Sequence, residues 1–218
     1  MEFNFGKLTI LKETLFLIDE VPIQNVQKFK YLGYQISNST ENDNIDVDFR
    51  ISLAENKFQS MKQILCDREL PIKLRSKYFL QTFVRSRLCY SVQAWDLKEH
   101  ELKTIESKWN GFLRRMVNGG FARKEDSMAY RYSNQDIIKI TETTPIRLYI
   151  QQQLKYLAHV CRMKNSDIRK QVLFAENSTR SHCIWHRWEK VLNMDKSQIR
   201  KVMMDRKKFF DFVTKINL

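Results

Sequence analysis

Two groups of histidine and cysteine side chains carry the residue types that bind zinc. His159 and Cys161 lie close together, and His182, Cys183 and His186 follow about twenty residues later. No Cys-x-x-Cys pair is present, and His159 falls in a helical pattern where a packed core histidine is the alternative. A Cys–His nucleophile would use the same residues, but nothing in the sequence indicates a third group to orient the histidine. The sequence therefore predicts no cofactor and no bound metal, and leaves these five residues as the zinc candidates.

Carboxylates are the residues that a metal-dependent polymerase needs, because they hold two metal ions about 3.5–4 Å apart. No two aspartates are adjacent in this sequence. Asp46 and Asp48 are two positions apart, so on a helix their side chains point to different faces. They are expected to supply negative charge at the start of a helix instead. On this criterion the chain is predicted to have no catalytic residues and, by itself, not to be an enzyme of this kind.

Basic side chains are the more prominent chemical feature. The chain has 38 Lys and Arg against 25 Asp and Glu, a net charge of +13, which favours polyanionic partners and nucleic acid first among them. We expect a groove along a phosphate backbone, with Tyr31 and Tyr34 packing on a sugar or base. The basic candidates for this groove are Lys73, Arg75, Lys77, Arg85, Arg87, Arg114, Arg115, Arg123, Lys124 and Arg131. The alternative is that these side chains only solvate the outside of a helical protein.

The overall composition indicates a packed helical fold. Hydrophobic residues make up 43% of the 218 residues and aromatic residues 12%, and only five glycines and three prolines are present. A chain of this length buries roughly 70% of the surface that its unfolded form exposes. Trp95, Trp109 and Trp188 fall on apolar stripes and are expected in the core.

The cellular setting is predicted from what the sequence lacks. No stretch approaches the roughly 18 apolar residues of a membrane span, and the N-terminus has no basic segment followed by an apolar one. The chain is therefore expected to be intracellular, nuclear or cytoplasmic, and not secreted. The scattered residues Cys66, Cys89, Cys161 and Cys183 are accordingly expected to be reduced thiols.

A strand is predicted over Phe29–Ile36, where Gly33 marks a bulge or a close approach of another backbone. The polar break Ile18–Glu20, between two apolar segments, adds a turn and so a small hairpin or three-strand piece. An isolated hairpin is marginal in water. Either the helices that follow cover it, or the chain continues upstream into a larger sheet.

Three amphipathic helices are predicted next. The first carries the stripe Val47, Ile51, Ala54, Phe58, Met61 and Leu65. The second begins near Pro71 and runs through Leu74, Tyr78, Phe79, Phe83, Val84, Leu88 and Val92 to Trp95. The third carries Leu102, Ile105, Trp109, Phe112 and Met116 and ends before Gly119–Gly120. An antiparallel three-helix bundle buries all three stripes.

The remainder is predicted to be helical after a basic loop at residues 119–133. Ser133 and Asp136 form a capping-box pattern at the start of a short helix. Thr144–Pro145 is expected to supply the N-cap and first-turn proline of the next helix, which runs from Ile146 through Leu154 and Leu157 to Met163. One last helix is predicted from Ile199 to Ile216.

Several of these segments resemble the reverse transcriptases of non-LTR retrotransposons, of the LINE type and similar to the RTE and CR1 groups. Lys30-Tyr31-Leu32-Gly33 is similar to their primer grip, which a three-helix thumb follows directly. The other matching segments, in family order, are Arg50-Ile51 with Ala54 and Phe58, Lys77-Tyr78, Leu88-Cys89-Tyr90, Ala94-Trp95, Phe112–Met116, Leu154–Met163, Arg187-Trp188 and Met204–Phe209.

Two departures from the family pattern are visible. The family usually has glycine where Ala158 stands, and a basic, Gly- and Pro-rich loop where this chain has residues 177–186. Any nucleic-acid contact of that loop is therefore in doubt here.

The resemblance implies that the chain is the rear part of such an enzyme. The primer-grip-like residues would be Phe29, Lys30, Tyr31, Leu32 and Gly33. The family's Tyr-x-Asp-Asp segment, which binds Mg²⁺ in the palm, would lie upstream of residue 1. The implied partners are RNA, an RNA–DNA hybrid and the missing upstream reverse-transcriptase and endonuclease portion, with no membrane.

The predicted fold is mainly α-helical. Residues 1–40 would form a β-hairpin remnant of the palm and primer grip, residues 41–120 a thumb-like three-helix bundle, and residues 121–218 a basic helical extension. This assembly would hold template RNA and primer duplex. The alternative is a repurposed helical module that binds proteins and has no nucleic-acid function.

Overall fold

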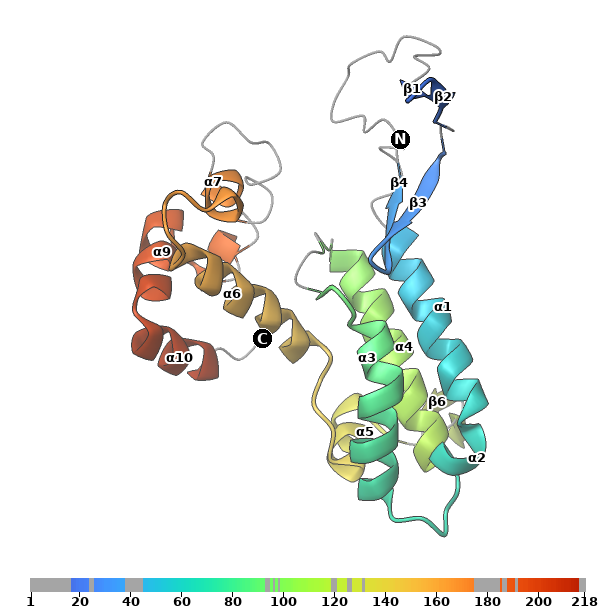
Figure 1. The fold of residues 1–218 in the computed structure, drawn as a ribbon. Coiled ribbons are helices and arrows are strands. Elements are labelled where there is room, and N and C mark those ends of the chain that lie inside the picture. Colours follow the sequence, from blue (N-terminus) through green and yellow to red (C-terminus); the bar gives the residue numbers. More distant parts are fainter. Residues whose placement is uncertain are drawn as a thin grey trace. The chain divides into compact units, whose positions relative to one another are not determined.

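The computed structural model describes residues 17–23, 26–37, 45–92, 95, 97, 99–118, 121–124, 127–130, 132–174, 185, 188–190 and 192–215. It confirms a mainly helical chain in which a short antiparallel hairpin precedes the helices (Figure 1). The chain forms two compact units. The first unit contains Met1–Tyr90 and Arg114–Arg131, and the second contains Ser91–Leu113 and Tyr132–Leu218.

Two tight hairpins begin the described part of the first unit. Strands β1 (Leu17–Ile18) and β2 (Val21–Pro22) pair around the turn predicted at Ile18–Glu20. Strands β3 (Lys28–Tyr31) and β4 (Tyr34–Ser37) pair around Leu32–Gly33. Both of these turn residues have positive φ, 48° and 84°, which a two-residue hairpin turn requires. The single strand predicted over Phe29–Ile36 is therefore wrong, because the chain reverses direction at the glycine that was expected to mark a bulge.

The first predicted helix is present as α1 (Ile45–Ser60) and a short α2 (Lys62–Leu65). The predicted stripe is confirmed, with the half-buried Met61 at the joint between the two helices. The buried members of that stripe are Val47, Ile51, Ala54, Phe58 and Leu65. Asp46 and Asp48 lie in the first turn as expected. Asp46 and Arg50, however, are also buried, although both lie off the stripe.

The second predicted helix is π-helical over η1 (Leu74–Arg85) and continues as α3 (Ser86–Leu88). The buried side chains along it are Ser76, Leu80, Val84 and Leu88. Tyr78 and Phe83 were predicted on the apolar stripe, but they are 59% and 38% exposed. The i→i+5 winding of a π-helix is wider than that of an α-helix, so the three-four spacing does not mark its inner face. The helix also ends at Leu88, short of the predicted Trp95.

The third predicted helix is α4 (Glu99–Val117), and every residue of its predicted stripe is buried. In the first unit α1 packs against η1 and α3, and α2 packs against η1. Only the last turn of α4 belongs to this unit. A complete three-helix bundle, and the predicted domain limits, stay predictions.

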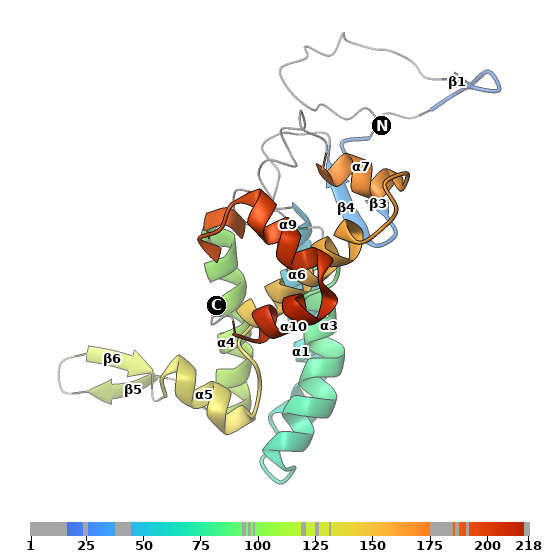
Figure 2. The same cartoon turned by 90° about the vertical axis from the view of Figure 1, so that its left-hand side faces the viewer.

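A third hairpin lies where residues 119–133 were predicted to form a loop. Strands β5 (Phe121–Lys124) and β6 (Ser127–Tyr130) pair in antiparallel register, with Phe121 opposite Tyr130 (Figure 2). The predicted loop is therefore wrong over these eight paired positions. The sequence has no Asn-Gly, Asp-Gly or Gly-Gly pair between these two strands, so it carried no strong hairpin signal.

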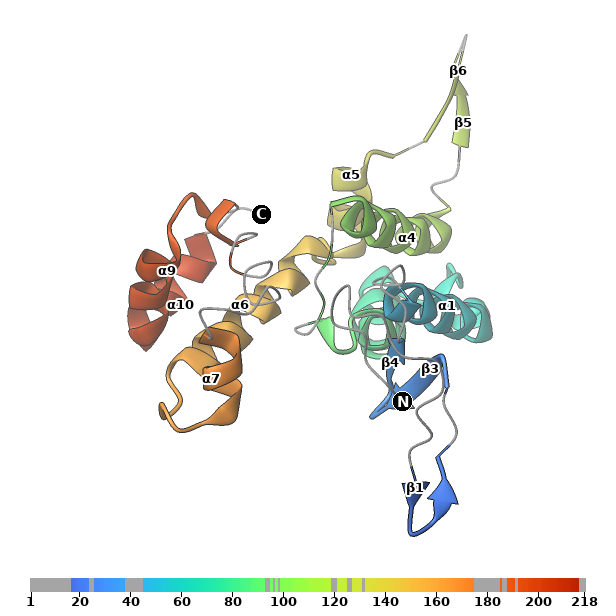
Figure 3. The same cartoon turned by 90° about the horizontal axis from the view of Figure 1, so that it is seen from above.

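The helices of the second unit that the structure describes over their full length follow α4. They are α5 (Asn134–Thr141), α6 (Arg147–Cys161), α7 (Ile168–Phe174), α9 (Lys196–Met204) and α10 (Arg206–Lys215). Helix α6 packs against α7 and α9, and α9 packs against α10 (Figure 3). The capping box of Ser133 and Asp136 is confirmed. The observed α6 agrees within two residues at each end with the helix predicted from Ile146 to Met163, but its N-cap is Ile146 and not Thr144.

The single last helix that the sequence predicts is wrong. The Asp205 carboxylate accepts hydrogen bonds from the backbone N–H groups of Lys207 and Lys208, at 3.0 Å each. These bonds cap the start of α10 and end α9. Ile216 lies outside the described residues.

The predicted core tryptophans Trp95, Trp109 and Trp188 are all buried. Cys66, Cys89 and Cys161 are free thiols as expected, and Cys183 lies outside the described residues. Among the helices that the structure describes, none has both the length and the apolar character needed to cross a membrane.

Candidate nucleic-acid interface

The primer-grip-like turn is bonded to the first helix by one arginine. The Arg50 guanidinium donates a hydrogen bond to the backbone carbonyl of Gly33. The same group lies 4.2 Å from the centre of the Tyr90 ring, and its Nε is 3.4 Å from Asp46 Oδ1. Asp46 and Arg50 are 3% and 5% exposed. A buried ion pair is tolerated only with such additional partners, because both charges have lost their water.

Two further hydrogen bonds complete this attachment. The Tyr90 hydroxyl donates to the carbonyl of Leu32 at 2.7 Å, and the backbone N–H of Gln35 donates to Asp46 Oδ1 at 3.0 Å. We call Asp46, Arg50 and Tyr90 the hairpin latch. The latch fixes the turn and one edge of the β3–β4 hairpin at the N-terminal end of α1 (Figure 1).

Gly33 fits this latch because it has no Cβ. Its φ is +84°, and a Cβ built there would lie 3.4 Å from the Tyr90 hydroxyl oxygen. Left-handed backbone favours glycine, whereas 3.4 Å is an ordinary van der Waals separation from the tyrosine. The positive φ of the turn therefore accounts for the glycine of the Lys-Tyr-Leu-Gly segment.

Side chains on both faces of strand β3 are exposed. Phe29 and Tyr31 alternate with Lys28 and Lys30 along β3, so the aromatic and basic side chains lie on opposite faces. Phe29 is 48% exposed and Tyr31 58%, and both lysines are exposed. Lys30 Nζ lies 5.9 Å from the centre of the Phe49 ring on α1. The latch thus presents exposed aromatic rings and ammonium groups on a fixed hairpin.

The predicted basic residues of η1 and α3 fall into three groups. Lys73 and Lys77 are exposed. Arg85 and Arg87 are half-buried, and their guanidinium groups donate to the Gln81 side chain at 3.1 Å and to the carbonyl of Phe83 at 2.7 Å. The third group is Arg75 alone.

Arg75 was expected on the solvent face, and that expectation is wrong. Its side chain is 6% exposed. Its Nε donates to the carbonyl of Leu70 at 2.9 Å, and its Nη1 donates to the carbonyls of Leu65 and Met116 at 2.9 and 3.0 Å. The last carbonyls of a helix lack partners within the helix, so this arginine satisfies the ends of both α2 and α4. Its first role is structural.

Arg115 also serves the fold. It forms a two-pronged ion pair with Glu55 of α1, at 2.6 and 3.1 Å, and lies 4.1 Å from the centre of the Phe58 ring. Arg114 beside it is half-buried. Arg123 and Lys124 lie in β5, and their side chains are outside the description, as is all of Arg131. The described basic residues thus separate into exposed ones and ones used internally, instead of lining one groove together.

Three residues of this surface were missed by the sequence reasoning. Lys28 alternates with Lys30, which is a readable signal once β3 is recognised as a strand. Arg50 lies four residues after Asp46, a spacing that brings opposite charges together on a helix. Tyr90 carries no local signal, because its partner Leu32 is distant in sequence.

The two zinc candidates that the structure describes, His159 and Cys161, do not face one another. His159 is exposed and Cys161 buried, since two residues apart on α6 they face different directions. His182, Cys183 and His186 lie outside the described residues. Within the residues described, no three His, Cys, Asp or Glu side chains gather in a way that would hold a metal ion.

Two of the described cysteine thiols, Cys89 and Cys161, have a raised pKa. Burial raises the pKa of Cys89 to about 12, although the Arg85 charge opposes the shift. Burial also raises the pKa of Cys161, against the opposing charge of Arg200. Because the thiolate is the nucleophile, neither side chain has the lowered pKa of a reactive cysteine.

Comparisons with models of protein families, with curated proteins and with solved structures found no match to this chain.

Proposed function

We propose that this chain is the rear part of a non-LTR retrotransposon reverse transcriptase, and that it holds the template RNA and primer duplex. The observation that carries the proposal is the latched hairpin. The turn Leu32–Gly33, within the segment that resembles the family's primer grip, is held by Arg50 and Tyr90 while Phe29 and Tyr31 stay exposed. Catalytic carboxylates and their Mg²⁺ would come from the palm, which this chain lacks on the proposal.

Charge and fixed geometry would contribute differently to binding of the duplex. Lysines neutralise phosphates and release their counterions, which supplies affinity but little positioning. Aromatic rings pack on sugars or bases and add about 1–3 kcal/mol per stacked base. A hairpin already fixed before binding loses less conformational freedom when it binds. The exposed Lys73 and Lys77 extend the positive charge along η1.

The test is binding of the full chain to a labelled RNA–DNA hybrid across a salt series. We expect affinity to fall as salt rises, by about 0.9 in log K per log salt for each duplex phosphate neutralised. The hairpin variant Lys28→Gln/Lys30→Gln should bind about tenfold or more weakly and show a smaller salt slope. Lys207→Gln/Lys208→Gln removes the same charge from two exposed residues of α10 and serves as the matched control.

Equal losses in the two double variants would mean that overall charge, not the hairpin, attracts the hybrid. No binding by wild-type protein that circular dichroism shows to be helical would refute the proposal outright. Either result would leave the second candidate function.

That second candidate is a protein-binding helical module. It is favoured by large apolar side chains that stay exposed on helices of the second unit, where a partner would bury them. They are Ile168, Val172, Met204 and Phe210. This function predicts that Ile168→Ser/Val172→Ser leaves the fold and any hybrid binding unchanged.

A further inference from the structure

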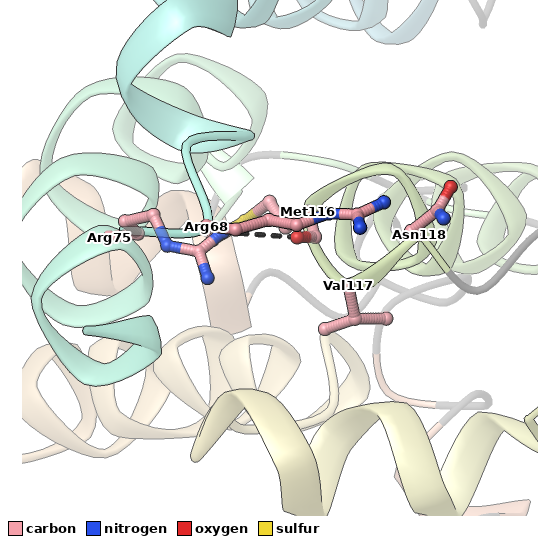
Figure 4. Close-up of a pocket in the computed structure, with 5 residues that line it drawn as sticks. All are labelled: Arg68, Arg75, Met116, Val117 and Asn118. Atoms are coloured by element: carbon pink, nitrogen blue, oxygen red, sulfur yellow. Dashed lines mark hydrogen bonds between the residues drawn. The ribbon is translucent and has the colours of Figure 1, made fainter. Parts of the chain in front are cut away.

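A pocket with two arginines lies at the end of α4 in the first unit. Its volume is about 270 Å³, and its lining residues are Arg68, Arg75, Met116, Val117 and Asn118 (Figure 4). Figure 4 shows the Arg75 guanidinium beside Met116 and the Arg68 guanidinium directed toward Asn118. The volume exceeds that of a single tetrahedral oxyanion, so the pocket has room for the ion and some of its water.

Arg75 is held rigidly at the inner side of this pocket. Its Nε and Nη1 donate to three backbone carbonyls, which fixes the plane of the guanidinium. Those bonds engage the carbonyls of Leu65 and Met116, whose partial negative charges would otherwise repel an anion at these helix ends. The second terminal nitrogen, Nη2, has no hydrogen-bond partner within the described part of the chain.

Arg68 adds a second positive charge to the pocket. Unlike the guanidinium of Arg75, it is not bonded to the helix-end carbonyls in the part of the chain that the structure describes. Its side chain is exposed, and no carboxylate among the described residues lies within ion-pair distance of Arg68 or Arg75. Two guanidinium groups that line one pocket favour an anion as its ligand. Asn118 adds an amide that donates hydrogen bonds, and its φ of 52° ends α4 at this point.

We propose that this pocket binds a phosphoryl oxyanion through Arg68, Arg75 and Asn118. Arginine suits such a ligand because its planar fork of donors matches two phosphate oxygens. The phosphate could belong to a nucleic-acid backbone or to a small molecule. The pocket is an oxyanion site in either case, so its existence does not depend on the proposed function of the hairpin.

The experiment is a titration of the full chain with inorganic phosphate at constant ionic strength, followed by ¹⁵N NMR. The backbone amides of Val117 and Asn118 and the Nε–H of Arg68 and Arg75 should shift saturably, with Kd on the order of millimolar. Arg68→Gln should weaken phosphate binding about tenfold or more, because it removes a charged hydrogen-bond donor. Arg206→Gln, at an exposed arginine of α10, is the matched control and should leave these shifts unchanged.

A second variant tests the same pocket by a substitution that is expected to leave the fold intact. Asn118→Gly keeps the backbone conformation, since glycine adopts positive φ readily, and removes only the amide. It should weaken phosphate binding by a smaller factor than Arg68→Gln. Shifts no larger than those caused by chloride, or equal binding by Arg68→Gln and Arg206→Gln, would overturn the site.

The RNA–DNA hybrid distinguishes the two sources of phosphate. If the nucleic-acid backbone occupies the pocket, Arg68→Gln also lowers hybrid affinity and reduces the salt slope by about 0.9. If a small molecule occupies it, phosphate binding is lost while hybrid binding is unchanged. A chain that binds phosphate here and no hybrid at all would refute the proposed function and support the pocket.

Discussion

At the scale of single residues, three side chains determine where the Leu32–Gly33 turn lies. They are the Asp46 carboxylate, the Arg50 guanidinium and the Tyr90 phenol. Asp46, Arg50 and Tyr90 each contact the hairpin directly, and Arg50 also touches the other two. The stability of the hairpin therefore depends on a small network and not on a hydrophobic face of its own. Such networks cost most when one member is removed.

The first prediction separates the members of the latch. Arg50→Met leaves the Asp46 carboxylate buried beside an apolar side chain, and should cost about 3–5 kcal/mol in the free energy of unfolding. Tyr90→Phe removes only the hydrogen bond to Leu32 and should cost about 0.5–1.5 kcal/mol. Urea unfolding followed by circular dichroism measures both.

The control for these variants is Ser52→Ala, on the exposed side of α1, which should change stability by less than about 0.5 kcal/mol. The double variant Asp46→Leu/Arg50→Met removes both charges and should recover part of the loss of Arg50→Met alone. An Arg50→Met protein as stable as wild type would show that the buried pair does not support the turn.

The second prediction compares two glycines, Gly33 at positive φ in a turn and Gly111 inside a helix. Gly33→Ala should destabilise the protein by about 1 kcal/mol or more, because alanine is strained at positive φ. Gly111→Ala should stabilise it by about 0.5–1 kcal/mol, since Gly111 is inside α4 and an added Cβ meets nothing within 4 Å. Thermal unfolding compares them, and a tolerated Gly33→Ala would contradict the turn geometry.

At the scale of elements, side-chain periodicity predicted α1 and α4 correctly, because one face of each packs against the core and is apolar at α-helical spacing. Periodicity failed for η1, whose π-helical winding changes which side chains face inward. It also placed Arg75 on the outside. That residue points inward because the carbonyl ends of α2 and α4 meet there, and such a meeting of distant segments has no local sequence signal.

Helix caps were predictable where they follow a local rule. Ser133 and Asp136 form the capping box that their spacing indicates. Asp195 caps α9 in the same way, and Asp205 caps α10. The candidate site was only partly predictable: the Lys-Tyr-Leu-Gly segment was found from its sequence, whereas Tyr90 was not, because its bond to Leu32 exists only in the folded chain.

The third prediction concerns acid. A hydrogen bond from the Ser133 side chain lowers the pKa of Asp136, and one from Ser197 lowers the pKa of Asp195, both below the ordinary 3.8. Because the folded-state pKa is depressed, the stabilisation is present above the unfolded pKa and is lost as pH falls through the folded pKa. The second unit should therefore lose stability in that acidic window.

Asparagine at both positions tests this pH dependence. At Asp195, the N-cap of α9, asparagine caps nearly as well as aspartate but does not titrate. At Asp136, the third residue of α5, the amide oxygen of asparagine can still accept the hydrogen bond from the Ser133 backbone N–H. Asp136→Asn/Asp195→Asn should thus flatten the loss of stability below about pH 4, measured by urea unfolding at a series of pH values. An unchanged pH dependence would mean that other carboxylates control the acid response.

At the scale of the whole molecule, the protein has a net charge of +13, a fixed β3–β4 hairpin and a pocket lined by two arginines. Charge brings a polyanion to the surface, and it does so at any exposed lysine. On the proposed function, the fixed β3–β4 hairpin would give the duplex a defined position. The central claim of that proposal is that the hybrid lies against β3.

Photocrosslinking tests that claim most directly. The full chain is irradiated with an RNA–DNA hybrid carrying 5-iodouracil, and the crosslinked residues are identified by mass spectrometry. The account predicts crosslinks at Phe29 and Tyr31, which disappear in Phe29→Leu/Tyr31→Leu while the protein stays folded. Crosslinks confined to the second unit, with none on β3, would contradict it.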